Sequence, residues 1–124
     1  IRPSGVHEPI GRSYSHARKA GNTVYAAGQV ALDAQGDLVG KDDIVAQTDQ
    51  VFKNLKGVLA AAGASFADIL KLTTYLTSRE DLPGFREGRQ RHLTGEPPAN
   101  TLVIVSGLAS PDFLLEIEAV AVVD

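Results

Sequence analysis

Hydrophobic residues recur at intervals of three or four between residues 43 and 63, which predicts a long amphipathic helix. Asp42 or Asp43 can accept hydrogen bonds from the free N–H groups at its start, and Gly63 can end it with a positive φ. The apolar stripe that would face a core consists of Ile44, Val51, Phe52, Leu55, Val58, Leu59 and Ala62.

Segments rich in β-branched and aromatic residues predict strands on both sides of this helix. A Gly36-Asp37 turn is expected to join the first strand to a short partner. The predicted strands cover residues 23–28 with a continuation toward Leu32, then 38–39, 67–77, 101–106 and 113–123.

A second helix is predicted over residues 80–93. The Thr77-Ser78-Arg79-Glu80 sequence has the S/T-x-x-E spacing of a capping box, in which two side chains satisfy free backbone donors at a helix start. Pro83 is tolerated because it lies in the first turn. Gly84 and Gly88 are expected to weaken the helix by about 1 kcal/mol each relative to Ala.

This order of elements predicts an α+β fold in which two helices cover one face of a mixed β-sheet. The last strand alternates, and its odd positions form a continuous apolar face suited to packing under the helices. Its even positions carry Glu116 and Glu118 between apolar residues, a mixture that suits neither a solvent face nor a monomer core. We therefore expect a homo-oligomer whose sheets pack together, with Glu118 near the boundary between chains.

Composition narrows the possible functions. The 124 residues suit one domain spanning residues 1–124, and 44% of them are hydrophobic, enough to form a core. A net charge of −3 disfavours a nucleic-acid partner, which usually requires a basic face. The chain has no cysteine, and we see no signal peptide or membrane-spanning run. We expect a cytoplasmic protein without a membrane partner.

Neither a metal site nor a serine hydrolase triad is predicted. His7, His16 and His92 lack metal-ligand spacing, and His16 is expected to lie on the surface. Ser15 and the other serines lack a G-x-S-x-G context.

Three segments of the chain together resemble one known family. They are "IGRSYSHARKAGNTVYAAGQVALD", "QTDQVFKNLKGVLAAAGASFADILKLTTYLT" and "GEPPANTLV" followed by "LLEIEAVAV". The sequence resembles the RidA family (reactive intermediate deaminase A, also called YjgF) over essentially its whole length. The resemblance implies a chorismate-mutase-like fold, a homotrimer with ligand clefts between subunits, and hydrolysis of enamines or imines without a metal or organic cofactor.

The resemblance also implies which residues line the cleft. Tyr14 matches an aromatic wall residue, and Gly28 matches a glycine whose backbone N–H faces the ligand. Glu118 matches the catalytic glutamate, which handles a water molecule or the substrate nitrogen. Asn100 falls where the family has an arginine that binds the substrate carboxylate. Because an uncharged amide replaces a charge-assisted pair, carboxylate binding at this position should weaken by about 1.5–3 kcal/mol.

Three arginines are candidates for restoring the missing charge. Arg86 on the second helix is the first choice, with Arg89 and Arg12 as alternatives. The opposing interpretation for Arg86 and Arg89 is that their stems cover apolar surface while their head groups stay in water.

The sequence therefore predicts a RidA-like hydrolytic deaminase of a reactive enamine, imine or related small metabolite, with an altered substrate preference because of Asn100. An aminomuconate-type enamine is one alternative substrate. The alternative function is a non-catalytic trimeric module that binds a small metabolite or a partner. Ammonia release from imines of simple amino acids is expected to be slow or absent.

Overall fold

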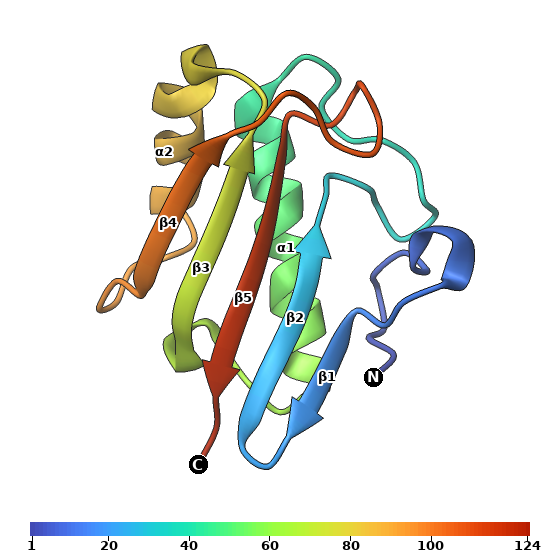
Figure 1. The fold of residues 1–124 in the computed structure, drawn as a ribbon, viewed down its shortest axis with the longest axis vertical. Coiled ribbons are helices and arrows are strands. Elements are labelled where there is room, and N and C mark those ends of the chain that lie inside the picture. The colour runs from blue at the N-terminus through green and yellow to red at the C-terminus, as the bar shows by residue number, and fades with distance from the viewer.

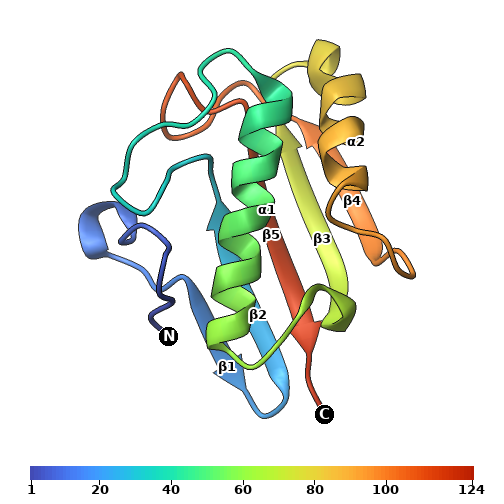
Figure 2. The same ribbon diagram turned by 180° about the vertical axis from the view of Figure 1, so that it is seen from behind.

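The computed structural model describes residues 1–124 and contains a five-stranded sheet backed by two helices (Figure 1). The strands, in chain order, are β1 (Ala17–Ala20), β2 (Thr23–Gln29), β3 (Ile69–Leu76), β4 (Ala99–Ile104) and β5 (Leu115–Val122). The helices are α1 (Ile44–Ala61) and α2 (Leu82–Gln90), and both lie on one face of the sheet (Figure 2). The α+β class and the placement of the helices are confirmed.

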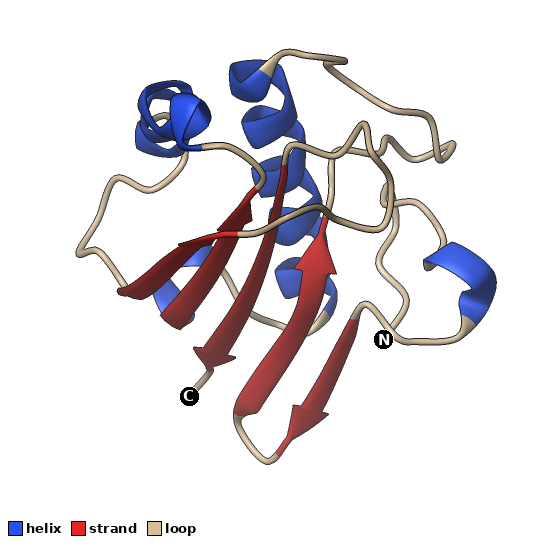
Figure 3. Ribbon diagram, turned by 45° about the horizontal axis from the view of Figure 1, so that its top comes forward, coloured by secondary structure: helices blue, strands red, loops and turns tan.

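The strands have the order β1-β2-β5-β3-β4 across the sheet. Only β3 and β4 are parallel, because α2 connects them by a crossover, and the other neighbours are antiparallel. The C-terminal strand β5 is therefore central, and β1 and β4 form opposite edges (Figure 3).

Helix α1 forms as the periodicity predicts. Asp43 caps it by accepting from the Ala46 N–H at 3.1 Å, and Gly63 follows it with a φ of 81°. Its apolar stripe packs on the even-numbered β3 residues Leu72 and Leu76 and the odd-numbered residues of β5, which are all buried. The alternation predicted for the last strand is confirmed, with Glu116 and Glu118 on the face that the helices leave uncovered.

The first half of the chain differs from the prediction in two ways. Strand β1, which forms a hairpin with β2, was not predicted. The turn at Gly36-Asp37 does return the chain, but residues 38–39 form only a single antiparallel bridge, from Leu38 to Leu32, and not a strand. The sequence pattern of β1 does not indicate a strand, because Ala17–Ala20 contains no β-branched or aromatic residue. Strand β1 forms through its hydrogen-bonded pairing with β2.

The second helix is shorter than predicted and begins differently. Residues 79–81 form a 3-10 turn in which Ser78, rather than Thr77, accepts from a backbone N–H, and Thr77 donates to the Leu114 carbonyl. Gly84 and Gly88 face α1, where a Cβ atom on Gly88 would overlap Thr48. These glycines weaken α2 locally but allow the two helices to approach each other closely. No helix is long and apolar enough to cross a membrane.

Candidate functional site

A bulge in β2 places Gly28 against the first glutamate of β5. Ala26 pairs with Ala119 and Gln29 pairs with Ile117, so the register pairs neither Ala27 nor Gly28 with a β5 residue. A Cβ atom on Gly28 would overlap the Glu116 carboxylate. The glycine is therefore required for the close approach of this carboxylate to the backbone of the bulge.

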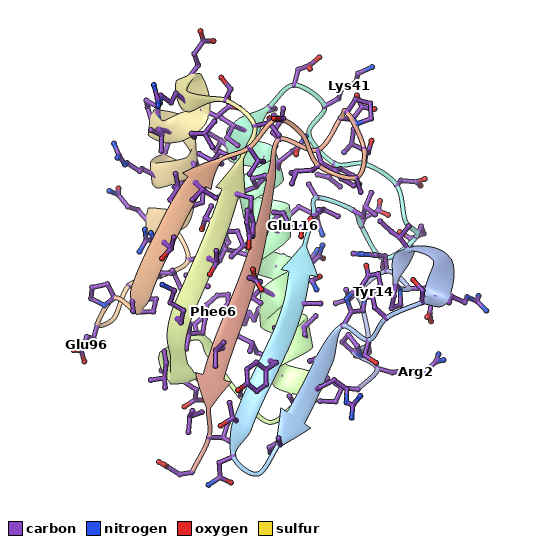
Figure 4. All side chains as sticks on the ribbon, viewed as in Figure 1. Arg2, Tyr14, Lys41, Phe66, Glu96 and Glu116 are labelled. Atoms are coloured by element: carbon purple, nitrogen blue, oxygen red, sulfur yellow. The ribbon has the colours of Figure 1, made fainter.

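Glu116 and Gly28 line a cavity of about 470 Å³ at the end of β2. Tyr14 forms another part of its wall, and Figure 4 labels Glu116 over the strands and Tyr14 on the N-terminal segment beside them. The remaining lining residues are Ile10, Ser15, Ala27, Val30, Ala109 and Phe113. The cavity is thus mainly apolar, and Glu116 and Tyr14 are the only residues of its wall with an ionisable side chain.

The environment of Glu116 favours its protonated form. Burial raises the pKa of the Glu116 carboxyl, and the negative charge of Glu118 raises it further. A carboxyl group whose pKa lies above its ordinary value of 4.5 can exchange a proton with a ligand closer to neutral pH. This property makes Glu116 a candidate for acid–base chemistry.

Glu118 lies one pleat further along β5 and is not part of the cavity wall. Its Oε1 accepts a hydrogen bond of 2.5 Å from the Tyr75 hydroxyl of β3, and this bond raises the pKa of Tyr75. The structure therefore brings two of the predicted site residues, Tyr14 and Gly28, together with Glu116 and leaves Glu118 on the open face. The resemblance had indicated Glu118, and not Glu116, as the catalytic glutamate.

A buried polar network supports the segment that carries Tyr14. His16 is only 3% exposed, so its predicted surface position is wrong. Its Nε2 lies 2.6 Å from the His7 carbonyl oxygen, and its Nδ1 lies 3.0 Å from the Gln29 amide nitrogen. Both ring nitrogens have partners, which is why the ring can be buried. The His16 ring also contacts the Tyr14 ring edge-on, with centroids 6.1 Å apart.

Asn100 lies at the opposite edge of the sheet from Tyr14 and Gly28. It pairs with Leu72 in the parallel β3–β4 ladder, so its side chain points to the helix side of the sheet rather than to the side of Glu116. Three strand spacings separate β2 from β4, a distance of about 14 Å. A small metabolite cannot contact Gly28 and Asn100 of the same chain.

Arg86 is exposed on α2 and forms no ion pair. Helix α2 follows β3 and precedes β4, so Arg86 lies on the Asn100 half of the molecule (Figure 2). No group of three or more His, Cys, Asp or Glu residues is placed to hold a metal ion.

The fold and the cavity define the class of the protein: an α+β protein with a small-molecule-sized pocket and a half-buried carboxyl group in its wall. The chain belongs to the Endoribonuclease L-PSP family, whose model matches residues 7–123. Its relatives include RutC and RidA proteins, so the predicted family is confirmed.

Three relatives illustrate the range of this family. A RutC family protein of Pyrococcus horikoshii is 42% identical over 114 residues, which are 92% of this chain and 89% of the relative. The 3-aminoacrylate deaminase RutC of Acinetobacter baylyi is 37% identical over 121 residues, 98% of this chain and 94% of the relative. A 2-iminobutanoate/2-iminopropanoate deaminase of Dermatophagoides farinae is 30% identical over 94% of this chain and 90% of the relative.

Solved structures agree with the fold. The crystal structure of RidA from Psychrobacter sp. PAMC 21119 matches with a TM-score of 0.91 and 33% identity, over 99% of this chain and 98% of that one. The crystal structure of E. coli TdcF with bound serine matches with a TM-score of 0.91 and 29% identity, over 100% of this chain and 98% of that one.

Proposed function

We propose that the protein is a hydrolytic deaminase of a reactive imine or enamine. The observation that carries the proposal is the half-buried Glu116 carboxylate in a largely apolar cavity beside Gly28 and Tyr14. The deaminase relatives support the reaction class, since they are similar to this chain over nearly its full length.

Glu116 takes the catalytic role that the sequence analysis gave to Glu118. In the reaction, water adds to the C=N carbon, a proton moves to nitrogen, and the C–N bond breaks to give ammonia and a carbonyl product. A carboxyl group with a raised pKa can pass a proton to the nitrogen and accept one from the attacking water. The backbone N–H of Gly28 in the β2 bulge can donate to a substrate oxygen, and Tyr14 bounds the pocket.

A neighbouring copy of the chain completes the site in this proposal. Asn100 and Gly28 of one chain cannot share a ligand, but β4 of one copy can meet the cavity of another if the open sheet faces pack together. The open face carries the exposed Tyr25 and Val103 and the half-buried Val120, which suits such packing. We propose a homotrimer, as the resemblance to RidA implies.

Ammonia release from imines generated in situ by an amino-acid oxidase, and from 3-aminoacrylate, tests the function. We expect turnover of at least one of these substrates, with a kcat/KM about 100-fold or more lower in Glu116→Gln. The pH dependence of kcat/KM should show a limb above 4.5 that disappears in this variant.

Glu118→Gln is the matched control, because it makes the same change two residues away on the same strand face. It should keep most of the activity. Equal loss in both variants, or loss in Glu118→Gln alone, would contradict the assignment to Glu116. If the unmodified protein binds these compounds without turning any of them over, the non-catalytic binding module is the correct function.

A further inference from the structure

A second cavity adjoins the Glu116 cavity and shares Tyr14 and Ser15 with it. It has a volume of about 290 Å³ and lies between the N-terminal segment and residues 12–16. Its wall includes Arg2, Arg12 and His7. The two cavities therefore meet at Tyr14 and Ser15, and the second one contains cationic side chains.

Residues 12–15 present hydrogen-bond donors that the protein itself does not use. The Arg12 guanidinium forms neither an ion pair nor a side-chain hydrogen bond. The Tyr14 oxygen accepts from the Ile10 N–H at 3.4 Å, which leaves its own hydroxyl proton free to donate. The Ser15 hydroxyl has no partner either. Arg2, by contrast, pairs with Glu8 at 3.6 Å.

The wall of this cavity carries little other charge. His7 is buried and packs edge-on against His16, with ring centroids 4.9 Å apart. Burial lowers the pKa of His7, and His16 acts in the same direction, so the ring is neutral at neutral pH. Because Arg2 and Glu8 offset each other, Arg12 supplies the net positive charge.

The backbone at Arg12 is also unusual. Its φ is 54°, in the left-handed region that glycine occupies far more readily than arginine. Residues other than glycine in strained backbone conformations of this kind are concentrated at active sites and ligand-binding sites.

We infer that Arg12, with the Tyr14 and Ser15 hydroxyls, binds the carboxylate of the substrate, in place of the arginine that residue 100 lacks. This inference rests on the proposed deaminase function and adds to it the residues that hold a substrate carboxylate. The groups that bind the carboxylate then come from residues 12–15 of the chain that carries Glu116, and neither Asn100 nor Arg86 contributes a charge to its binding.

Binding of a product analogue tests the inference without turnover. The probes are 2-oxobutanoate and its neutral amide, 2-oxobutanamide, titrated into the intact protein by calorimetry. We expect the unmodified protein to prefer the acid, and Arg12→Gly to weaken binding of the acid by about 10- to 100-fold with little effect on the amide. Since glycine tolerates a φ of 54°, the thermal midpoint of Arg12→Gly should be unchanged or raised, which excludes a merely structural role.

Two further variants make the result decisive. Lys53→Gln removes one exposed charge from α1 and should leave both affinities unchanged. Arg86→Gln tests the rival cation. Loss of acid binding in Arg86→Gln with none in Arg12→Gly, or no preference for the acid over the amide, would overturn the inference. These titrations measure binding and not turnover, so their result does not depend on whether Glu116→Gln lowers the rate of ammonia release.

Discussion

At the scale of single residues, the sequence identified the right kinds of side chain but not always the right position. Tyr14 and Gly28 line the cavity as predicted, whereas Glu116 rather than Glu118 joins them. Both glutamates lie on the same face of the last strand, so alternation alone cannot separate them. The bulge at Gly28 distinguishes the two glutamates, because it brings the backbone of β2 against Glu116.

His7 makes stability depend on pH. Because burial lowers the pKa of His7, the unfolded chain binds a proton more readily than the folded one below the ordinary pKa of 6.5. Folding stability should therefore fall as the pH decreases from about 7 through the lowered pKa of His7. Thermal unfolding between pH 5 and 8 should show this decline, and it should be shallower in His7→Asn. An unchanged slope in the variant would contradict the assignment of the decline to His7.

At the scale of elements, the strongly periodic segments were predicted well and the short ones were not. Helix α1 and strand β5 each present a long apolar face, and both form with that face buried. Strand β1 has no such pattern and exists because β2 offers it hydrogen bonds. Gly84 and Gly88 lower the helix propensity of α2, but they allow α2 to pack closely against α1.

Gly88 therefore offers a test of helix packing. Ala should be the better helix former by about 1 kcal/mol, but its Cβ would overlap the buried Thr48, whose hydroxyl is bonded to the Ile44 carbonyl at 2.7 Å. Overpacking of this kind costs about 1–3 kcal/mol, so Gly88→Ala should be destabilised on balance. Chemical denaturation measures the difference. Gly95→Ala, where a Cβ meets open space, is the control and should not be destabilised.

At the scale of the whole molecule, two features support the proposed self-association. They are the uncovered sheet face and the separation between the Glu116 cavity and Asn100. The cavity beside Glu116 lies at the end of β2, while Asn100 lies on the far edge strand. Tyr25 is 56% exposed on the open face, and its partner across the ladder is Val120. An apolar patch of this kind is typical of an interface between chains.

Val120→Glu should disrupt such an interface. Val120 lies between Tyr25 and Lys71 on the open face, so a glutamate there removes apolar contact but gains a cationic neighbour within the same chain. Sedimentation velocity should change from a trimer to a monomer that remains folded, and deaminase activity should be lost with it. Ala60→Glu, which adds the same charge at an exposed position of α1, should stay trimeric. A monomeric unmodified protein would contradict the proposed assembly.

The sequence by itself determined the family, the two helices on one sheet face and the alternation of β5. These features follow from local periodicity or from short motifs, which neighbouring residues along the chain encode. The tertiary structure decided which glutamate enters the cavity, that His16 is buried, and that three strand spacings separate Gly28 on β2 from Asn100 on the edge strand β4. These features depend on ladder register and on contacts between residues far apart in the chain, and no local pattern specifies them.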